Sequence, residues 1–111
     1  MDFDTARRFL LAQTIAPVPG QTPFLNCLQM GMAPVPGQVT SILLALKTVA
    51  QALQSEPSIE RSLGFALFLL AYESRQLYLH GQTQNVDWPP LLDEDLTRIA
   101  EAVRQIWASA A

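Results

Sequence analysis

The sequence predicts an all-α protein, a single domain over residues 1–111 built as a small bundle of four main helices plus one short helix with Pro-rich connectors. Three observations predict this fold class. Apolar residues recur at helical spacing in several segments, no alternating run is bounded by a hairpin turn, and stretches with Pro and Gly separate the helical segments. A chain of 111 residues can bury one core without a disulfide or a structural metal.

The first two helices are expected close to the N-terminus. One covers about residues 4–13 and has Asp4 as its N-cap. The other is short and covers about residues 23–30. Thr22 would cap it, proline suits its first position, and Gly31 would end it because glycine readily takes the left-handed conformation found at helix C-termini.

Two long helices are expected next. Residues 38–55 carry one apolar stripe at helical spacing, and Pro57 closes this helix. Residues 58–80 are apolar on nearly all sides, and Gly81 would stop that helix. Because a helix that is apolar all round is buried, we expect this fourth helix to be contacted by several other helices or by a partner chain.

A polar connector over residues 82–92 leads to the last helix. It contains Trp88 followed by two prolines and should be extended there. Trp88 either packs beside the helix that it precedes, as a staple, or offers a stacking surface to a ligand. The last helix starts near Asp93, where three consecutive acids complement the positive end of the helix dipole.

The strongest internal signal is a hexapeptide, Ala-Pro-Val-Pro-Gly-Gln, that occurs at residues 16–21 and again at residues 33–38. Each copy should be a stiff, extended segment that ends in a glycine turn. The pair is either a recognition device, because pre-extended Pro-x-Pro segments bind grooves at low entropic cost, or a duplication kept because it turns the chain well. The candidate partner-binding residues are Pro17, Val18, Pro19, Pro34, Val35, Pro36 and Trp88.

Glu73 is the most unusual ionisable residue, because it shares an apolar stripe with Leu70 and Leu77. A carboxylate there is costly unless it is paired or hydrogen-bonded. The structural interpretation is a salt bridge to an arginine of another helix or subunit, and the functional one is a tuned acid or an interaction anchor. If the protein instead binds a small molecule between its helices, Glu73, Arg75 and Tyr72 would supply polar contacts.

The single histidine and the single cysteine have simpler interpretations. His80 should cap the end of its helix, and Cys27 should be a packed thiol. A catalytic pair of the two would need a proximity that their spacing does not indicate. The sequence contains no P-loop, zinc-binding or hydrolase motif. We therefore expect no enzymatic activity, no metal site and no cofactor.

Charge and hydropathy limit the partners and the location. The net charge is −3 and the seven basic residues are scattered, which argues against nucleic acid as a partner. The longest apolar run covers residues 63–72, whereas crossing a bilayer takes about 20 residues. The N-terminus is acidic, unlike a signal peptide, and a lone cysteine fits a reducing compartment. We expect a cytoplasmic protein with no membrane insertion.

Three stretches resemble a family of short, uncharacterised cyanobacterial helical proteins. They are GMAPVPGQVTSILLALK at residues 31–47, LAYESRQL at residues 70–77 and VDWPPLLD at residues 86–93. The resemblance implies a cytoplasmic protein of a photosynthetic bacterium and carries over no site residues. Some relatives are labelled dethiobiotin synthetase, an enzyme class that needs a P-loop on a parallel sheet, and this sequence has neither signal.

The functional expectation combines these observations. Half of the residues are hydrophobic, which is a high fraction for so short a chain. We expect a non-enzymatic protein-interaction module, a homodimer that acts as an assembly or regulatory factor for a larger cytoplasmic complex, with photosynthesis or carbon fixation as its setting if the resemblance holds. The alternative is a small-molecule binding module with an apolar pocket. An enzyme comes third and a DNA-binding helix-turn-helix fourth.

Overall fold

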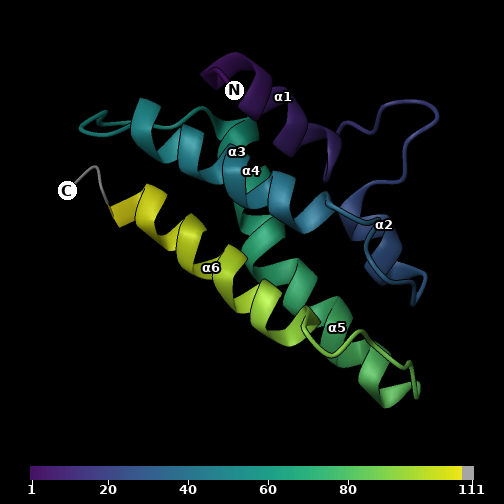
Figure 1. Cartoon of the computed structure of the whole chain (residues 1–111). Helices are drawn as coiled ribbons and strands as arrows, with labels where there is room; N and C mark the ends of the chain where they lie inside the picture. Colours follow the sequence, from purple (N-terminus) through teal and green to yellow (C-terminus); the bar gives the residue numbers. More distant parts are fainter. Residues whose placement is uncertain (109–111) are drawn as a thin grey trace.

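The computed structural model describes residues 1–108, and within that range it contains helices and no strand, so the predicted all-α fold class is confirmed. Figure 1 shows how the helices are arranged. They are α1 (Phe3–Ala12), α2 (Phe24–Gln29), α3 (Gln38–Ala52), α4 (Arg61–Phe68), the π-helical turn η1 (Leu69–Glu73), α5 (Ser74–Thr83) and α6 (Leu92–Ala108).

One long helix organises the fold, because α4, η1 and α5 follow one another without a break from residue 61 to residue 83. It runs behind α3 and α6 in Figure 1. Its first part packs against α1, its π-helical part against α6, and its last part against α2. The expectation that several helices contact this central helix is therefore correct.

The core lies between these helices, and α3 contributes to it from the front by packing against both α1 and α6. Helices α1, α2, α3, α4 and α6 each supply several buried apolar side chains to one continuous cluster, η1 supplies Leu70, and α5 packs against the cluster with partly buried side chains. Each fully buried Leu, Ile or Phe stabilises the fold by about 1.5–3 kcal/mol relative to an exposed one. The largest fully buried side chains are Leu10, Phe24, Leu28, Ile42, Leu46, Leu63, Leu67, Leu70, Leu92, Leu96, Ile99 and Ile106.

The start of α1 differs from the prediction by its capping residue. Asp2, in an extended conformation, is the N-cap, and its Oδ1 accepts a hydrogen bond of 2.7 Å from the backbone N–H of Thr5. This bond holds the pKa of Asp2 below its usual value. Asp4 lies in the first turn and forms an ion pair with Arg8 instead. The assignment of Asp4 as N-cap was therefore wrong by two residues.

The start of α2 is capped from a distance. Pro23 occupies the N-cap position, so Thr22 is not the cap and proline is not the first helical residue. The backbone N–H of Phe24 donates to the side-chain oxygen of Gln13, at the end of α1, over 3.0 Å. A cap supplied by a residue so far back in the chain leaves no local sequence signal, which is why the prediction missed it.

Two glycines predicted to end helices turn out to have different roles. Gly31 has φ +71°, and the N–H groups of Gly31 and Met32 donate back to the carbonyls of Leu28 and Cys27, a Schellman motif that confirms the predicted end of α2. Gly81, by contrast, lies inside α5 and is buried. The prediction that Gly81 stops its helix was wrong.

The end of α5 falls at Thr83, and Asn85 is the residue that terminates it. Asn85 has φ +63°, and the N–H groups of Asn85 and Val86 donate to the carbonyls of Gln82 and Gly81. This is again a Schellman motif, with asparagine in place of glycine. The glycine at position 81 serves packing instead, because a Cβ there would lie 2.4 Å from Cζ2 of Trp88.

The third predicted helix is shorter than expected, since α3 ends at Ala52 and not at Ser55. Ser55 has a left-handed φ of +69°, which reverses the chain before Pro57 is reached. The last helix begins at Leu92, and the acids Asp93, Glu94 and Asp95 occupy its first turn, as the dipole argument expected. Within residues 1–108 no helix combines the length and the apolar character needed to cross a bilayer.

Candidate interaction surfaces

Both copies of the hexapeptide adopt the same turn. In the first copy the N–H of Gln21 donates to the carbonyl of Val18 over 3.1 Å, and in the second the N–H of Gln38 donates to that of Val35 over 2.9 Å. The intervening glycines have φ +84° and +81°. Proline followed by a left-handed glycine is the pattern of a type II β-turn. The predicted stiff segment with a glycine turn is confirmed in both places.

The surroundings of the two turns are different. All six residues of the first copy are exposed, whereas the glutamine that ends the second copy is buried as the first residue of α3. The side-chain amide of Gln38 donates to Oε1 of Gln13 over 2.8 Å and to the carbonyl of Thr22 over 2.9 Å. Its own oxygen accepts the N–H of Val35 over 2.9 Å. The second turn is therefore held from inside the protein.

Gln13 and Gln38 form a buried, hydrogen-bonded glutamine pair that joins the end of α1, the start of α2 and the start of α3. Gln13 closes α1 and caps α2, while Gln38 fixes the second hexapeptide at the start of α3. Within the described part of the chain no buried side-chain nitrogen or oxygen is left without a partner. The sequence signal for this pair was present, since Gln13 shares the apolar face of its helix, but a lone glutamine there does not reveal its partner.

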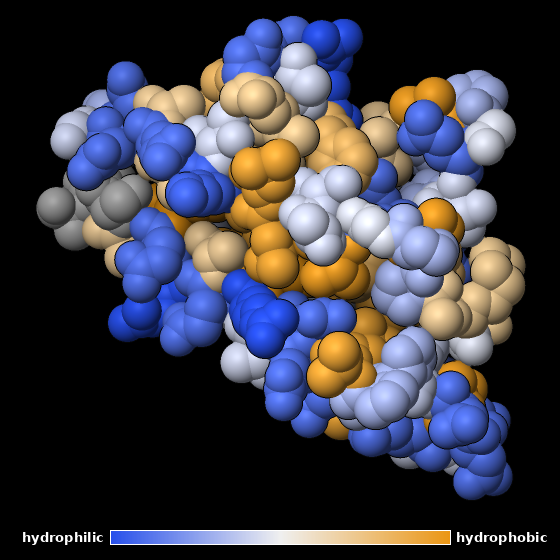
Figure 2. All heavy atoms as spheres, viewed as in Figure 1, coloured by the Kyte–Doolittle hydropathy of each residue, from blue (hydrophilic) through white to orange (hydrophobic). Residues whose placement is uncertain are grey.

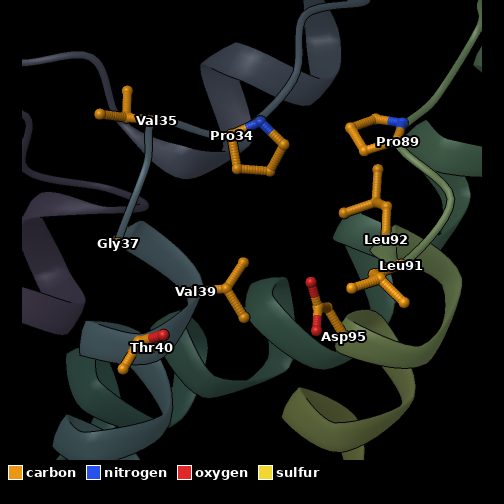
Figure 3. A pocket seen from close by; sticks show the side chains of 9 residues that line it. All are labelled: Pro34, Val35, Gly37, Val39, Thr40, Pro89, Leu91, Leu92 and Asp95. Carbon is orange, nitrogen blue, oxygen red and sulfur yellow. The ribbon is translucent and has the colours of Figure 1, made fainter.

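An open hollow lies between the second hexapeptide and the connector that precedes α6, and we call it the proline groove (Figure 3). Its volume is about 260 Å³. Pro34 and Pro89 face each other across it, and the only charged side chain in its lining is Asp95. The lining residues are Pro34, Val35, Gly37, Val39, Thr40, Pro89, Leu91, Leu92 and Asp95. Figure 2 shows apolar side chains gathering in the middle of this face, where α3 and α6 run side by side.

One wall of the groove is formed by the second hexapeptide and the other by the connector with Pro89 and Leu91, which Trp88 anchors to α5. The indole N–H of Trp88 donates to the carbonyl of Tyr78 over 3.0 Å, and its ring is stacked on that of Tyr78 at 5.9 Å between centroids. The ring also lies directly over Gly81. Trp88 therefore packs against α5, the helix before it, because Gly81 leaves room for an indole there.

The predicted partner-binding residues separate into three groups. Pro34 and Val35 line the proline groove and Trp88 supports it. Pro36 lines a second hollow of about 340 Å³ between the two hexapeptides, which Gln21 and Phe9 also border. The three residues predicted to bind a partner in the first copy, Pro17, Val18 and Pro19, lie outside both linings on an exposed loop. Val39, Leu91 and Asp95 join the groove although the sequence did not single out any of them as partner-binding residues.

The three polar residues predicted to share a ligand pocket do not converge. Arg75 reaches α6, where its guanidinium lies 2.6 Å from Oδ1 of Asp93 and donates to the side chain of Thr97. It also lies over the ring of Tyr78. Glu73 is half-buried, and its carboxylate forms no hydrogen bond or ion pair with any residue of the range 1–108. The predicted salt bridge from Glu73 to an arginine of another helix is therefore wrong within residues 1–108, and a salt bridge to another subunit stays a prediction.

Tyr72 belongs to a row of aromatic side chains that we call the aromatic surface. The row consists of Phe65, Phe68 and Tyr72 on the long helix together with Trp107 of α6, and each side chain is 50–52 % exposed. The rings of Phe68 and Tyr72 are stacked with 5.2 Å between centroids. Trp107 adjoins the row because its ring lies against Gly64, where a Cβ would be 3.3 Å from it.

The remaining chemically interesting residues lie apart from these surfaces. Cys27 is fully buried with its sulfur 3.9 Å from Oε1 of Gln38, and burial raises the pKa of its thiol. His80 is exposed in the last part of α5. Among residues 1–108 no group of three or more His, Cys, Asp or Glu side chains is placed to hold a metal ion.

Comparison with known proteins leaves these surfaces to be interpreted on their own geometry. No protein-family model matches the chain, and no similar chain is found among curated proteins or among solved structures.

Proposed function

We propose that this chain is a non-enzymatic protein-interaction module, an assembly or regulatory factor of a larger cytoplasmic complex, and that the proline groove receives the partner. The observation that supports this proposal is an open groove whose lining side chains are mostly Pro, Val and Leu, whose exposed surface is about equally polar and apolar, and whose two walls are each held by a hydrogen bond involving a partly or fully buried side chain. The resemblance to cyanobacterial proteins makes photosynthetic or carbon-fixing complexes the first place to look for the partner.

Rigidity matters because ordering flexible loops reduces affinity. Each side chain that becomes immobilised on binding costs about 0.5–1.5 kcal/mol. On one wall, the buried amide of Gln38 holds Val35, and proline restricts the backbone at Pro34. On the other wall, the bond from Trp88 to Tyr78 fixes the chain just before Pro89. A partner would therefore meet a surface that is already in its binding conformation.

The size and charge of the groove define the partner's chemistry. Pockets for small molecules usually measure about 300–1,000 Å³, and the proline groove, at about 260 Å³, is smaller and open to solvent. It suits one or two aliphatic side chains of an extended protein segment. Asp95, the one carboxylate in the lining, favours a Lys or Arg next to those side chains, in competition with Arg98, whose guanidinium lies 3.6 Å from its Oδ1. We therefore expect an apolar segment flanked by a basic residue.

The two hexapeptides supply a matched experiment. Val35 and Val18 occupy the same position in the two copies and are 47 % and 44 % exposed, but only Val35 lines the groove. A partner recovered with the tagged chain from its source cells is purified, and its affinity for wild type and variants is measured by calorimetry. Val35→Ser and Leu91→Ser should each weaken binding about tenfold, whereas Val18→Ser should leave it unchanged.

Two results would overturn the proposal. One is a purified partner that binds wild type, Val35→Ser and Leu91→Ser equally well while circular dichroism shows all three folded. The other is the lack of any purified protein that binds the wild-type chain directly. Asp95→Asn adds a further check, since it should weaken binding and reduce its dependence on salt.

A further inference from the structure

We infer that the aromatic surface is the contact between two copies of this chain, which pack antiparallel along α4 and η1 about a two-fold axis. The aromatic surface shares no residue with the proline groove, so the inference goes beyond the proposed function and can stand without it.

The spacing along the long helix is that of a helix–helix seam. Arg61, Phe65, Phe68 and Tyr72 follow one another at steps of four, three and four residues, the a/d spacing of paired helices. The wider winding of η1 still leaves Tyr72 on the side of Phe68, as their stacked rings show. When a second copy runs antiparallel, Phe65 of each copy meets Phe68 of the other, and Arg61 meets Tyr72.

The two ends of this aromatic row carry opposite charges, Arg61 at one end and Glu73 at the other. The exposed side chain of Arg61, one turn before Phe65, forms no ion pair or hydrogen bond with any residue of the range 1–108, and the carboxylate of Glu73, next to Tyr72, forms none either. Glu60, the residue before Arg61, differs from Glu73 because its carboxylate already accepts two hydrogen bonds from Arg7 of α1. In the antiparallel pair, Arg61 of one copy lies over Tyr72 and beside Glu73 of the other.

This arrangement also excludes the parallel alternative. A parallel pair would place Arg61 against Arg61 and Glu73 against Glu73, and like charges facing each other oppose association. The antiparallel pair forms two cation–π contacts and two ion pairs, one of each at either end, because a two-fold axis repeats every contact. The charge pattern therefore selects the orientation that the aromatic spacing permits.

The exposed area is adequate for a dimer of moderate affinity. An aromatic side chain buries about 150–250 Å² when fully covered, so four half-exposed ones offer about 300–500 Å² per copy. A standard interface needs about 800 Å² per partner, and the rest would come from the neighbouring faces of α4 and α6. We expect a dissociation constant on the order of micromolar.

The test exchanges the charges at the ends of the row in the full chain and measures the dimer dissociation constant by sedimentation equilibrium. R61E and E73R should each weaken the dimer about tenfold. The double variant R61E/E73R should return to within about threefold of wild type, and an equimolar mixture of the two single variants should form a heterodimer. Within one chain the two positions are about 18 Å apart along the helix, so restoration must act between copies.

Two further variants test the aromatic contacts. Phe68→Ser should weaken the dimer at least tenfold. Leu79→Ser, which changes an exposed leucine of the same long helix outside the row, should leave it unchanged. Thermal unfolding by circular dichroism verifies that each variant is folded.

Three outcomes would overturn the inference: a wild-type chain that sediments as a monomer at high concentration, a double variant that stays as weak as the single ones, or a dimer that Phe68→Ser does not affect. A monomeric chain that still binds a partner through Val35 and Leu91 would overturn only this inference. A dimer that recovers with the charge exchange, but whose partner ignores Val35→Ser, would overturn only the proposed function.

Discussion

The two copies of the hexapeptide share every residue and form the same turn, yet one lies on the surface and the other is built into the core. In each copy a valine carbonyl accepts the N–H of the glutamine, across a proline and a left-handed glycine. Only the second glutamine is buried, against Gln13. The six residues therefore determine the turn conformation by themselves, whereas the rest of the molecule determines whether the final glutamine is buried.

The residues that follow each copy explain the difference. Gln21 precedes Thr22 and Pro23, and the residue before a proline is disfavoured in the helical conformation, so no helix can begin there. Gln38 precedes a run of good apolar helix positions and becomes the first residue of α3. The start of a helix that packs on α1 carries Gln38 inward, where Gln13 meets it.

The largest effect should come from removing the glutamine of the second copy. Gln38→Ala leaves the carbonyl of Thr22 and the N–H of Val35 without their partner and opens a buried gap, so we expect a loss of about 2 kcal/mol in the free energy of unfolding. Gln21→Ala should change it by less than about 0.5 kcal/mol. Urea unfolding followed by circular dichroism measures both.

A thiol-reactive dye gives an independent reading of the same pair of variants. Cys27 lies against Gln38, so its labelling in the folded protein should be about tenfold faster in Gln38→Ala than in wild type. Gln21→Ala should label like wild type. Equal losses of stability in the two variants would show that the buried bonds of Gln38 contribute nothing beyond those of an exposed residue.

The next largest effect concerns the glycine that is required by packing and not by backbone conformation. Gly81→Ala places a methyl group 2.4 Å from the ring of Trp88, which must move and give up its bond to Tyr78. Overpacking costs about 1–3 kcal/mol, and alanine returns up to about 1 kcal/mol of helix propensity. We expect a net loss of about 1–2 kcal/mol in thermal or urea unfolding, with a change in tryptophan fluorescence. An unchanged spectrum and stability would contradict the assigned packing.

A smaller and equal effect is expected from the turn glycines of the two copies. Gly20→Ala and Gly37→Ala each force a side chain into the left-handed region, and neither Cβ would touch another atom. Each should cost about 1 kcal/mol of unfolding free energy. Because the turns are the same, the two values should agree within about 0.5 kcal/mol. A clear difference between them would show that tertiary contacts, and not local conformation, hold one of the turns.

The smallest effect should lie at the surface, in the pair of Arg7 and Glu60 that joins α1 to α4 without touching either copy. A bond from the Ser62 hydroxyl and the guanidinium of Arg7 hold the pKa of Glu60 below its ordinary value of 4.5. A lowered folded pKa adds stability above pH 4.5, and this is lost as the pH falls through the folded value. Glu60→Gln should therefore flatten the fall of stability below that pH while leaving stability near neutrality almost unchanged. A steeper fall in the variant would contradict the assignment.

The interaction surfaces show where prediction from sequence reached its limit. Composition alone singles out the second hexapeptide and the Trp-Pro-Pro connector. It does not predict that Pro34 and Pro89 face each other, because these residues are 55 positions apart in the chain. The aromatic row could be read as apolar surface on the back of the fourth helix. That it stays half exposed depends on which helices cover the other sides.

By itself, the sequence determined the features that depend on a few neighbouring residues: the helical segments, the two type II turns and the end of α2 at Gly31. Only the tertiary structure decided that Gln13 caps α2, that Gln38 and not Gln21 is buried, and that Gly81 makes room for Trp88. Backbone preferences act over a single turn of chain, whereas burial is decided by contacts between segments that are distant in sequence, so identical hexapeptides can end in different environments.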